Sequence, residues 1–345
     1  MLPSQRHLFE MPREICYLNA ASYSPLALRT QEAGRAAVGR KGQPWTLDAS
    51  FANTQHERAR AAAARLINAD PADIALIPSV SYGVATAAKS LTISRGARVI
   101  VLENDHSSPV LEWHARADAQ GFVVETIRQP ADGDWTAALL AAIERRAAPP
   151  VDLASISSVH WSDGGLIDIE KVGAALRRQG AVFLIDATQG AGVLTMDVRR
   201  LDPDFVVFPT YKWLLGPYGR ASMYVARRHQ GAIPLEQTSS GRRNVRAEND
   251  VYFTDIALRL AMLTERIAEQ VRPLGLGVLH ERLRAPHVLS LGFKHGMPNG
   301  LVERLATEGV YVAARLGRLR VSPHVYNDET DADRFVETLA RRLEG

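Results

Sequence analysis

One lysine of the chain stands in an apolar setting that a surface lysine does not need. Lys212 follows the run FVVFPT (205–210) and precedes an apolar patch and two glycines in the segment KWLLGPYG. Asp186 ends another apolar run, VFLID. A buried amine and a buried carboxylate are both costly when each stands alone. On neighbouring strand ends, the two groups together predict a bound organic cofactor that needs both.

Pyridoxal phosphate is a cofactor with these needs. A lysine holds its aldehyde as a Schiff base, and a carboxylate keeps its ring nitrogen protonated so that the ring can accept electrons. Its phosphate suits hydroxyls and free amides at the N-terminus of a helix. The segment SVSYG (79–83) lies between a predicted strand and a predicted helix, and it supplies Ser79, Ser81 and several amides. The sequence therefore predicts a pyridoxal-phosphate site.

Two other kinds of site fit less well. The segment SVSYGVA holds one glycine, whereas a dinucleotide-binding fingerprint has G-x-G-x-x-G after the first strand. The chain has ten histidines, but no His-x-x-x-His pair or carboxylate cluster stands at one strand end. The sequence therefore favours neither a dinucleotide nor a metal.

Seven short apolar runs must position these groups. They are near-continuous in apolar residues, which is typical of strands covered on both faces in a parallel sheet. The predicted strands are 75–79, 97–104, 122–127, 153–161, 182–188, 205–210 and 222–226. Helical patterns occupy 54–67, 81–91, 108–120, 134–147 and 168–179. The alternation predicts a doubly wound α/β core whose functional loops lie at the carboxyl ends of the strands.

The pattern of the sequence changes after about residue 240. Residues 252–275 read as a long helix, and 301–327 as helix, strand, turn and strand. Residues 328–343 begin with acidic residues and end with arginines, as expected of a final helix. We predict a large cofactor-binding α/β domain at 46–240 and a smaller α+β domain formed by 1–45 and 241–345.

Polar residues also follow two further strands of the predicted sheet. His106 follows the second strand in ENDH, and His160 and Asp163 follow the fourth in VHWSDGG. A histidine beside the cofactor can stack on its ring. For His160, packing in the core is as consistent with the sequence as a place in the active site.

Three segments resemble the class V aminotransferases of pyridoxal-phosphate fold type I. This family includes cysteine desulfurases, kynureninase, isopenicillin-N-epimerase-like proteins and ergothioneine C–S lyases. The segments are CYLNAASYSP (16–25), with Cys16 in a strand-like stretch, DATQG with TYKWLLGPYG, and RVSPHVYNDETDADRF (320–335). The resemblance runs nearly end to end. It implies a mostly parallel seven-stranded sheet with helices on both faces, a smaller α+β domain and a homodimer.

The resemblance also implies a role for each matching residue. Lys212 would form the Schiff base, Asp186 would pair with the pyridine nitrogen, and His106 would stack on the ring, so these three are the predicted catalytic residues. The predicted cofactor-binding residues are Ser79, Val80, Ser81, His106, Asp163, Asp186, Gln189, Thr210, Tyr211 and Lys212. Asn19 and Ala21 would line the substrate side, and Arg320 would clamp the substrate carboxylate. Residues 238–246 are a candidate for reaching the partner's cofactor phosphate or, equally, for a solvated basic loop.

The chain departs from the family pattern at two places. Asp163 stands where the family has an asparagine that contacts the cofactor. Pro209 and Tyr211 stand where cysteine desulfurases often carry a Ser-x-His pair before the lysine.

The family's reactions share a first stage, in which an amino-acid substrate forms an external aldimine and loses its Cα proton to Lys212. Transamination, β-elimination, epimerisation and Cβ cleavage all start in this way. Cysteine desulfurases also need a mobile cysteine in the second half of the chain, whereas Cys16 is the single cysteine here. The sequence therefore argues against a desulfurase that forms a persulfide on its own cysteine. The closing pattern RVSPHVYN resembles the epimerase-like and C–S lyase branches of the family more than the serine–pyruvate branch, which implies C–S lyase or epimerase-like chemistry. Transamination with a 2-oxo acid and a catalytically inactive cofactor-binding protein are the alternatives.

Composition restricts the remaining possibilities. Apolar residues make up 46% of the chain and charged residues 23%, as in an ordinary globular protein, and no apolar run is long enough to cross a bilayer. The net charge is +3, but the arginines are scattered rather than gathered in one stripe, so we predict no nucleic-acid partner. A single cysteine and the lack of a signal-peptide pattern predict a cytoplasmic location.

Overall fold

The computed structural model describes residues 3–48, 50–232, 235, 256–285, 287–324 and 326–344. The chain divides into two compact units, residues 1–243 and 244–345. This division puts residues 1–45 in the first unit, whereas the sequence suggested that they join the small domain. The domain boundaries inferred from the sequence stay a prediction.

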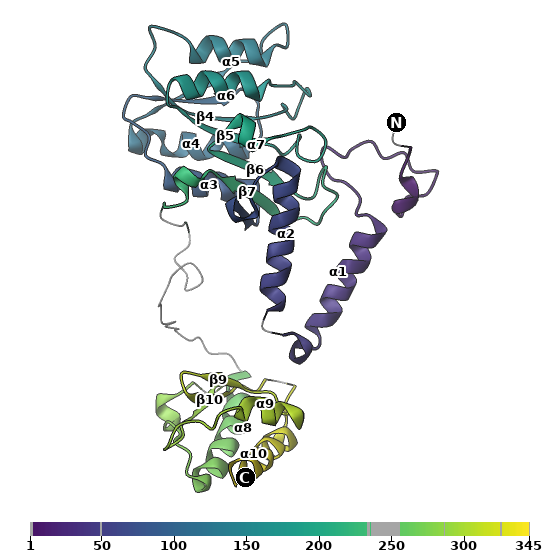
Figure 1. Ribbon diagram of the computed structural model, residues 1–345, viewed down its shortest axis with the longest axis vertical. Helices are drawn as coiled ribbons and strands as arrows, with labels where there is room; N and C mark the ends of the chain where they lie inside the picture. Colours follow the sequence, from purple (N-terminus) through teal and green to yellow (C-terminus); the bar gives the residue numbers. More distant parts are fainter. Residues whose placement is uncertain are drawn as a thin grey trace. The chain divides into compact units, whose positions relative to one another are not determined.

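The first unit is built on a seven-stranded sheet with the order β1-β7-β6-β5-β4-β2-β3 (Figure 1). Its strands are β1 (Ile74–Ile77), β2 (Arg98–Leu102), β3 (Val123–Ile127), β4 (Val151–Ser157), β5 (Val182–Asp186), β6 (Phe205–Pro209) and β7 (Ala221–Val225). β7 is antiparallel to β6 and β1, and the other neighbouring pairs are parallel. The predicted mostly parallel seven-stranded sheet is confirmed.

Helices cover both faces of this sheet, as predicted. The α-helices are α1 (Leu28–Lys41), α2 (Phe51–Ile67), α3 (Val80–Ser90), α4 (Ser107–Gln120), α5 (Trp135–Ile143), α6 (Ile169–Arg178) and α7 (Val198–Leu201). Short 3-10 helices occur at η1 (Arg6–Leu8), η2 (Pro44–Thr46), η3 (Pro71–Asp73) and η4 (Arg227–His229). One core packs α2, α5, α6 and α7 against one face of the sheet, and a second core packs α3 and α4 against the other.

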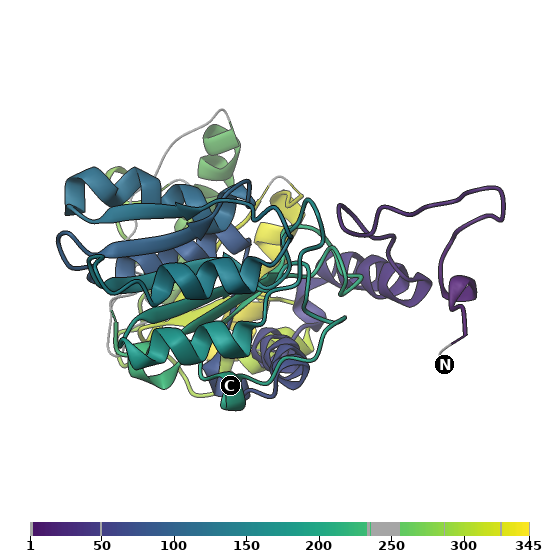
Figure 2. The ribbon, with the colours of Figure 1, turned by 90° about the horizontal axis from the view of Figure 1, so that it is seen from above.

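Side chains at the helix ends explain where several helices start and stop. Ser79 caps α3 by accepting a hydrogen bond from the Tyr82 N–H, and Asp168 caps α6 by accepting one from the Lys171 N–H. Asn68 ends α2 in the left-handed conformation, which asparagine tolerates better than most residues. α1 was not predicted from the sequence. It buries none of its residues, and Figure 2 shows it standing clear of the sheet.

Two predicted strand segments are loops in the structure. β4 ends at Ser157, so residues 158–161 were wrongly assigned to a strand. The chain turns back there, because the His160 N–H donates to the Gly165 carbonyl and the Ile167 N–H donates to the Ser158 carbonyl. The stretch CYLN around Cys16, which reads as strand-like in the sequence, forms no strand.

The second unit is a smaller α+β fold with its own core. Its elements are α8 (Ile256–Val271), η6 (Arg272–Leu274), η7 (Glu281–Leu283), β8 (Leu289–Leu291), α9 (Leu301–Thr307), β9 (Ala313–Arg315), β10 (Arg318–Val321) and α10 (Glu329–Glu344). The strands form an antiparallel sheet of order β8-β10-β9, against which the three α-helices pack. Among the helices that the structure describes in either unit, none has the length and apolar character needed to span a membrane.

Candidate active site

Lys212 lies in the loop after β6 and is 6% exposed, whereas the four other lysines are all exposed. Burial lowers the pKa of its amine, and the nearby Asp186 carboxylate opposes this shift. Within the described residues the amine makes no hydrogen bond or salt bridge. The ring of Tyr211 lies 5.8 Å from it. An amine that is buried and has no partner is expected where the protein binds a ligand.

Asp186 is the last residue of β5 and is 2% exposed. Burial raises the pKa of its carboxyl to about 6; the charge of Asp105 adds to this, while Lys212 and hydrogen bonding from Thr188 oppose it. The Thr188 N–H donates to Oδ1 at 2.8 Å. No salt bridge reaches this carboxylate within the described residues. A buried carboxylate of this kind is stabilised when a positive group binds beside it.

His106 stands at the N-terminus of α4, at the end of the loop that follows β2. Burial lowers the pKa of its imidazole, the charge of Lys212 lowers it further, and Asp105 opposes both. The ring meets the Trp161 ring edge-on, with 6.3 Å between centroids. Lys212 is therefore close enough to influence the ionisation of both His106 and Asp186, as the carboxyl ends of parallel strands allow.

The N-termini of α3 and α4 meet on the same side of the sheet. The Ser81 Oγ lies 2.9 Å from the Ser108 Oγ, which lies 3.3 Å from the His106 Nδ1. The amides of Val80 and Ser81 in the first turn of α3 have no intrahelical acceptor. Ser79, Val80 and Ser81 thus present hydroxyls and free amides, which is the chemistry that a phosphate needs.

The chain matches one protein family over most of its length. The family model described as "Aminotransferase class-V" covers residues 34–273. The chain belongs to the class V aminotransferase family. The resemblance seen in the sequence is confirmed, and the protein is a pyridoxal-phosphate-dependent enzyme of the aminotransferase superfamily.

Several class V relatives and structures are similar to this chain. An uncharacterized aminotransferase, YcbU of Bacillus subtilis, is 26% identical over 317 residues, which are 83% of each chain. Cysteine desulfurase IscS of Azotobacter vinelandii is 27% identical over 272 residues, which are 72% of this chain and 66% of the relative. A mutant of C-DES with glycine covalently linked to its pyridoxal-phosphate cofactor matches with a TM-score of 0.60 and 20% identity, covering 98% and 99% of the chains. A second structure that matches this chain is a complex of C-DES, described as a cystine C–S lyase, with its reaction product cysteine persulfide.

The residues of this class V site fit pyridoxal phosphate. Within the part of the chain that the structure describes, Lys212 offers an amine without a hydrogen-bond partner for the aldehyde, and Asp186 offers a carboxylate without a salt bridge for the ring nitrogen. The first turn of α3 offers hydrogen-bond donors for the phosphate. Among the described residues, no three His, Cys, Asp or Glu side chains are grouped so that they could hold a metal ion.

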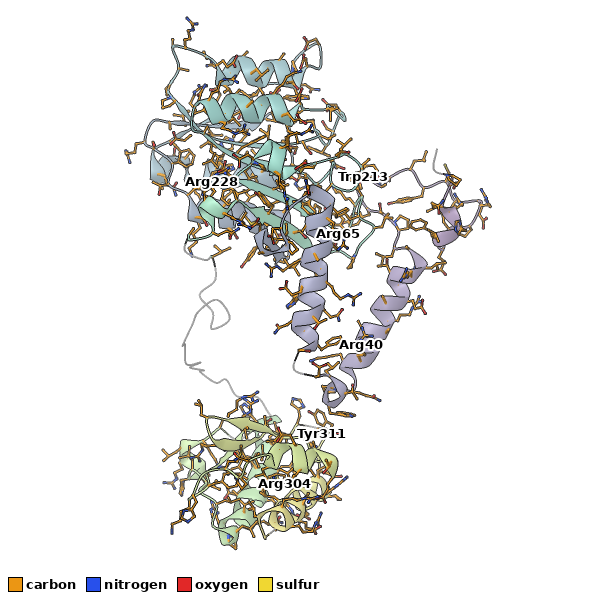
Figure 3. All side chains as sticks on the ribbon, in the orientation of Figure 1. Arg40, Arg65, Trp213, Arg228, Arg304 and Tyr311 are labelled. Carbon is orange, nitrogen blue, oxygen red and sulfur yellow. The ribbon has the colours of Figure 1, made fainter. Side chains whose placement is uncertain are left out.

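Gln189 links the lysine loop to the N-terminal segment. Its Nε2 donates to the Ala21 carbonyl at 3.2 Å, and its Oε1 accepts from the Nε1 of Trp213, which Figure 3 labels, at 2.7 Å. The Ser24 N–H also donates to the Tyr211 carbonyl. Ala21 therefore lies beside the lysine loop, and its predicted place on the substrate side stays a prediction. The predicted contact of Gln189 with the cofactor stays a prediction.

Asn19 belongs to the same N-terminal segment. Its carbonyl accepts from the N–H groups of Ser22 and Tyr23, which closes a turn. The ring of Tyr23 then packs 5.4 Å from that of Tyr211. The turn brings Asn19 toward the lysine loop, and its contact with substrate stays a prediction.

Thr210 and Tyr211 are engaged inside the lysine loop. The Thr210 hydroxyl donates to the Pro217 carbonyl at 2.8 Å and so closes the loop. The ring of Tyr211 packs against that of Tyr218, with 4.6 Å between centroids. Both residues shape the loop that carries Lys212, and their predicted help in phosphate binding stays a prediction.

Asp163 is engaged with residues of its own neighbourhood. Its carboxylate accepts from the Gln129 Nε2 at 2.8 Å, the Trp135 Nε1 at 3.2 Å and the Gly165 N–H at 2.8 Å, and it lies 3.1 Å from the His160 Nδ1. Burial would raise its pKa, but the bonds from Gly165 and Trp135 and the charge of His160 outweigh burial and lower it. These contacts favour a part in holding His160, and direct contact with the cofactor stays a prediction.

His160 is fully buried and stacks on Trp135, with 4.7 Å between ring centroids. Its Nε2 lies 3.0 Å from the Glu103 carbonyl, in the loop that leads to His106. The sequence left open whether His160 packs in the core or takes part in the active site. These contacts favour packing in the core.

Arg320 lies on β10 in the second unit. Its Nε is buried and has no hydrogen-bond partner within the described residues, so one donor remains for a ligand. Its predicted contact with the substrate carboxylate stays a prediction. The segment 238–246, a candidate for reaching the partner's phosphate, lies outside the described residues.

Three polar residues beside the site were not singled out in the sequence: Asp105, Ser108 and Ser157. Asp105 follows an apolar run in the same way as Asp186 does, and it directly precedes His106. That signal was present in the sequence. Ser108 and Ser157 carry no signal of their own, because serines are common at helix starts and strand ends.

Proposed function

We propose that this enzyme acts on an amino-acid substrate by removing its Cα proton, with Lys212 as the base, and follows with C–S lyase or epimerase-like chemistry. The buried Lys212 amine, unpaired within the described residues and close to the buried Asp186 carboxylate, carries the proposal. When bound, pyridoxal phosphate supplies an electron sink for the pair of electrons left at Cα.

Each residue of the site contributes a distinct physical effect. The lowered pKa of Lys212 increases the fraction of neutral amine, which is the form that accepts a proton. Asp186 would hold the proton on the cofactor's ring nitrogen, and His106 would lie against its ring. The N-terminus of α3 would bind the phosphate and so hold the cofactor close to Lys212.

The substrate carboxylate would be bound by Arg320. The unpaired Nε of its guanidinium supports this role, because bidentate binding of a carboxylate uses adjacent guanidinium donors. Asn19 and Ala21 would line the substrate side of the lysine loop, which the bond from Gln189 to Ala21 supports.

A persulfide on the enzyme's own cysteine is not part of this proposal. Cys16 is the single cysteine, and it is exposed in the N-terminal segment. Relatives named cysteine desulfurases and a structural neighbour named a cystine C–S lyase share the fold. A lyase that releases its sulfur product directly needs no such cysteine.

Transamination is the second candidate. The relative named as an aminotransferase matches this chain over 83% of both lengths, a larger share than the desulfurase from Azotobacter. Transamination would use the same base and the same electron sink, and it differs in requiring a 2-oxo acid to complete the cycle.

We also propose a cytoplasmic homodimer. α1 buries no residue, and a helix of 14 residues is marginal in water when nothing covers it. Val38 of α1 is 75% exposed and Leu18 is 91% exposed, so this part of the first unit presents apolar surface to a second copy.

The proposed base is tested by titrating the wild type, Lys212→Ala and Lys294→Ala with pyridoxal phosphate. We expect a visible absorbance band in the wild type and in Lys294→Ala, whose lysine is exposed, and none in Lys212→Ala. Borohydride reduction followed by peptide mass spectrometry should place the label on Lys212. A labelled lysine elsewhere, or a wild type that takes up no cofactor, overturns the proposal.

The reaction is then resolved with the loaded wild type and Cys16→Ser. Cystine and S-substituted cysteines are expected to yield pyruvate and ammonia without a 2-oxo acid, equally in both proteins. Exchange of the Cα hydrogen with deuterated water, followed by NMR, tests proton removal separately. Turnover only when a 2-oxo acid is present would select transamination, and loss of turnover in Cys16→Ser would contradict the proposal.

A further inference from the structure

Building on the proposed function, we infer that Asp105 is a positioning residue of the cofactor site. It ties the loop that carries His106 to the end of β4 and places a second carboxylate beside Asp186. Asp105 thereby helps to keep the cofactor's ring nitrogen protonated and the His106 ring in place.

The hydrogen bonds of Asp105 connect the loop that carries His106 to the end of β4. Its Oδ1 accepts from the Ser157 Oγ at 2.7 Å and from the His106 N–H at 2.7 Å. Its Oδ2 accepts from the Ser157 N–H at 3.2 Å. One carboxylate thus joins the residue that starts α4 to the last residue of β4, with both oxygens in use.

The rest of the loop is bound to the same neighbour. The Glu103 carbonyl lies 3.0 Å from the His160 Nε2, and the Asn104 carbonyl accepts from the Trp161 Nε1 at 2.7 Å. Asn104 has a φ of 56°, a left-handed conformation that surrounding contacts must hold in place. Residues 103–105 are therefore all attached to residues 157–161, and Asp105 is the attachment that carries a charge.

The second effect is electrostatic. Ser157 pairs with Asp186 across β4 and β5, so its bonds to Asp105 bring the two carboxylates to adjoining strand ends. The donors to Asp105 are neutral, and no salt bridge reaches either carboxylate within the described residues. Asp105 and Lys212 influence the ionisation of both Asp186 and His106. Tyr211 is a further titratable group beside Asp186, whose charge contributes to the raised pKa of the Tyr211 hydroxyl.

Asp186 acts on the Lys212 amine, and Asp105 acts on Asp186. The charge of Asp105 raises the pKa of Asp186 in addition to the effect of burial. A protonated ring nitrogen would supply the missing positive charge, and both carboxylates would favour it. The site therefore selects the protonated form of the cofactor more strongly than Asp186 would alone.

Two variants separate the effect of the Asp105 charge from the effect of its hydrogen bonds to Ser157. Asp105→Asn removes the charge and leaves one acceptor, whereas Ser157→Ala removes one hydrogen bond and leaves the charge. In the full chain without cofactor, isotope-edited NMR of aspartate carboxyl carbons follows the titration of Asp186, whose signal is the one missing from Asp186→Asn. We expect the pKa of Asp186 to fall toward its ordinary value in Asp105→Asn and to stay near the wild-type value in Ser157→Ala.

Binding of pyridoxal phosphate gives the second readout. We expect Asp105→Asn to weaken binding about tenfold, because the lost interaction acts at short range in a partly buried site. Ser157→Ala should weaken the binding of pyridoxal phosphate by a smaller factor. An Asp186 carboxyl that titrates at the same pH in Asp105→Asn as in the wild type overturns the inference.

Failure of the proposed function can be distinguished from failure of the inference about Asp105. A wild type that binds no cofactor contradicts the proposed function, while the titration of Asp186 without cofactor still decides the role of Asp105. If Asp105→Asn does not fold, Asp105→Ser takes its place, since its hydroxyl keeps one acceptor without the charge. A pKa of Asp186 that falls toward its ordinary value supports the inference in that variant, and an Asp186 that titrates as in the wild type contradicts it.

Discussion

At the scale of single residues, the site is defined by charges that are costly to bury. Lys212 and Asp186 are nearly inaccessible, and each shifts the pKa of the other toward its charged form while burial acts in the opposite direction. Without a ligand, neither group has a hydrogen-bonded partner of opposite charge within the described residues. Binding a cofactor that is positive at one atom and reactive toward an amine at another relieves both costs.

This electrostatic cost predicts how stability depends on pH. The folded-state pKa of Asp186, about 6, lies above its ordinary value of 3.8, so between these values the folded protein binds more protons than the unfolded chain. Stability contributed by the protonated form is present below about pH 4 and is lost as the pH rises through about 6. We expect cofactor-free wild type to lose about 3 kcal/mol more than Asp186→Asn across this range.

Urea denaturation of the two cofactor-free proteins at several pH values measures this difference. Asp186→Asn is the matched comparison because an amide occupies the same volume and does not titrate. Parallel dependence of the free energy of unfolding on pH in the two proteins would contradict the prediction.

At the scale of elements, the loop from β6 to β7 must hold Lys212 at a fixed height above the sheet. The Gly216 N–H donates to the Thr210 carbonyl, and the Thr210 hydroxyl donates to the Pro217 carbonyl. A Cβ on Gly216 would lie 2.7 Å from the Thr210 Cβ. The glycine is therefore required by close approach within the loop, and the loop is a compact structure rather than a loose connection.

We expect Gly216→Ala to displace this loop. The substitution should cost about 1–3 kcal/mol of stability, because the clash involves a Cβ and backbone atoms that cannot turn aside. Cofactor affinity should fall as Lys212 moves. Gly231→Ala is the control, since a Cβ there meets nothing within 4 Å. Thermal denaturation and cofactor titration check the effect, and equal behaviour of the two variants would argue against a rigid loop.

At the scale of the whole molecule, each unit has a core of its own. The first unit has one core on each face of its sheet, and the second packs its helices on a three-stranded sheet. The proposed dimer is a property of this scale, because α1 packs none of its residues into the core of the first unit. A helix with no buried residue contributes to a stable fold only when another surface covers it.

We expect Val38→Asp to weaken the homodimer, since it puts a charge on the exposed apolar surface of α1. Val123→Asp on the edge strand β3 is the control, because Val123 is also exposed, at 54%. Sedimentation velocity at several concentrations should show wild type and Val123→Asp at twice the mass of the chain, and Val38→Asp shifted toward the monomer. A wild type that sediments as a monomer would contradict the dimer.

Much of the fold and the centre of the site could be predicted from the sequence alone. The apolar runs located all seven strands of the large sheet, because strands covered on both faces leave a continuous apolar pattern. Lys212, Asp186 and His106 were singled out because each is a polar residue at or shortly after the end of such a run, and their catalytic roles stay predictions. Because burying a charge is costly, a charged residue within an apolar segment is unusual and can be recognised in the sequence.

Only the tertiary structure decided which side chains are taken by other partners. Gln189, Thr210 and Asp163 stand at the right strand ends, but their hydrogen bonds go to Ala21, Pro217 and the surroundings of His160. Asp105 and Ser157 are 52 residues apart and meet because β2 lies next to β4 in the sheet, with β3 at the edge. Strand order depends on long-range packing, whereas the sequence pattern reports only local burial. The sequence therefore determined the chemistry of this site, and the strand order determined how its residues are held.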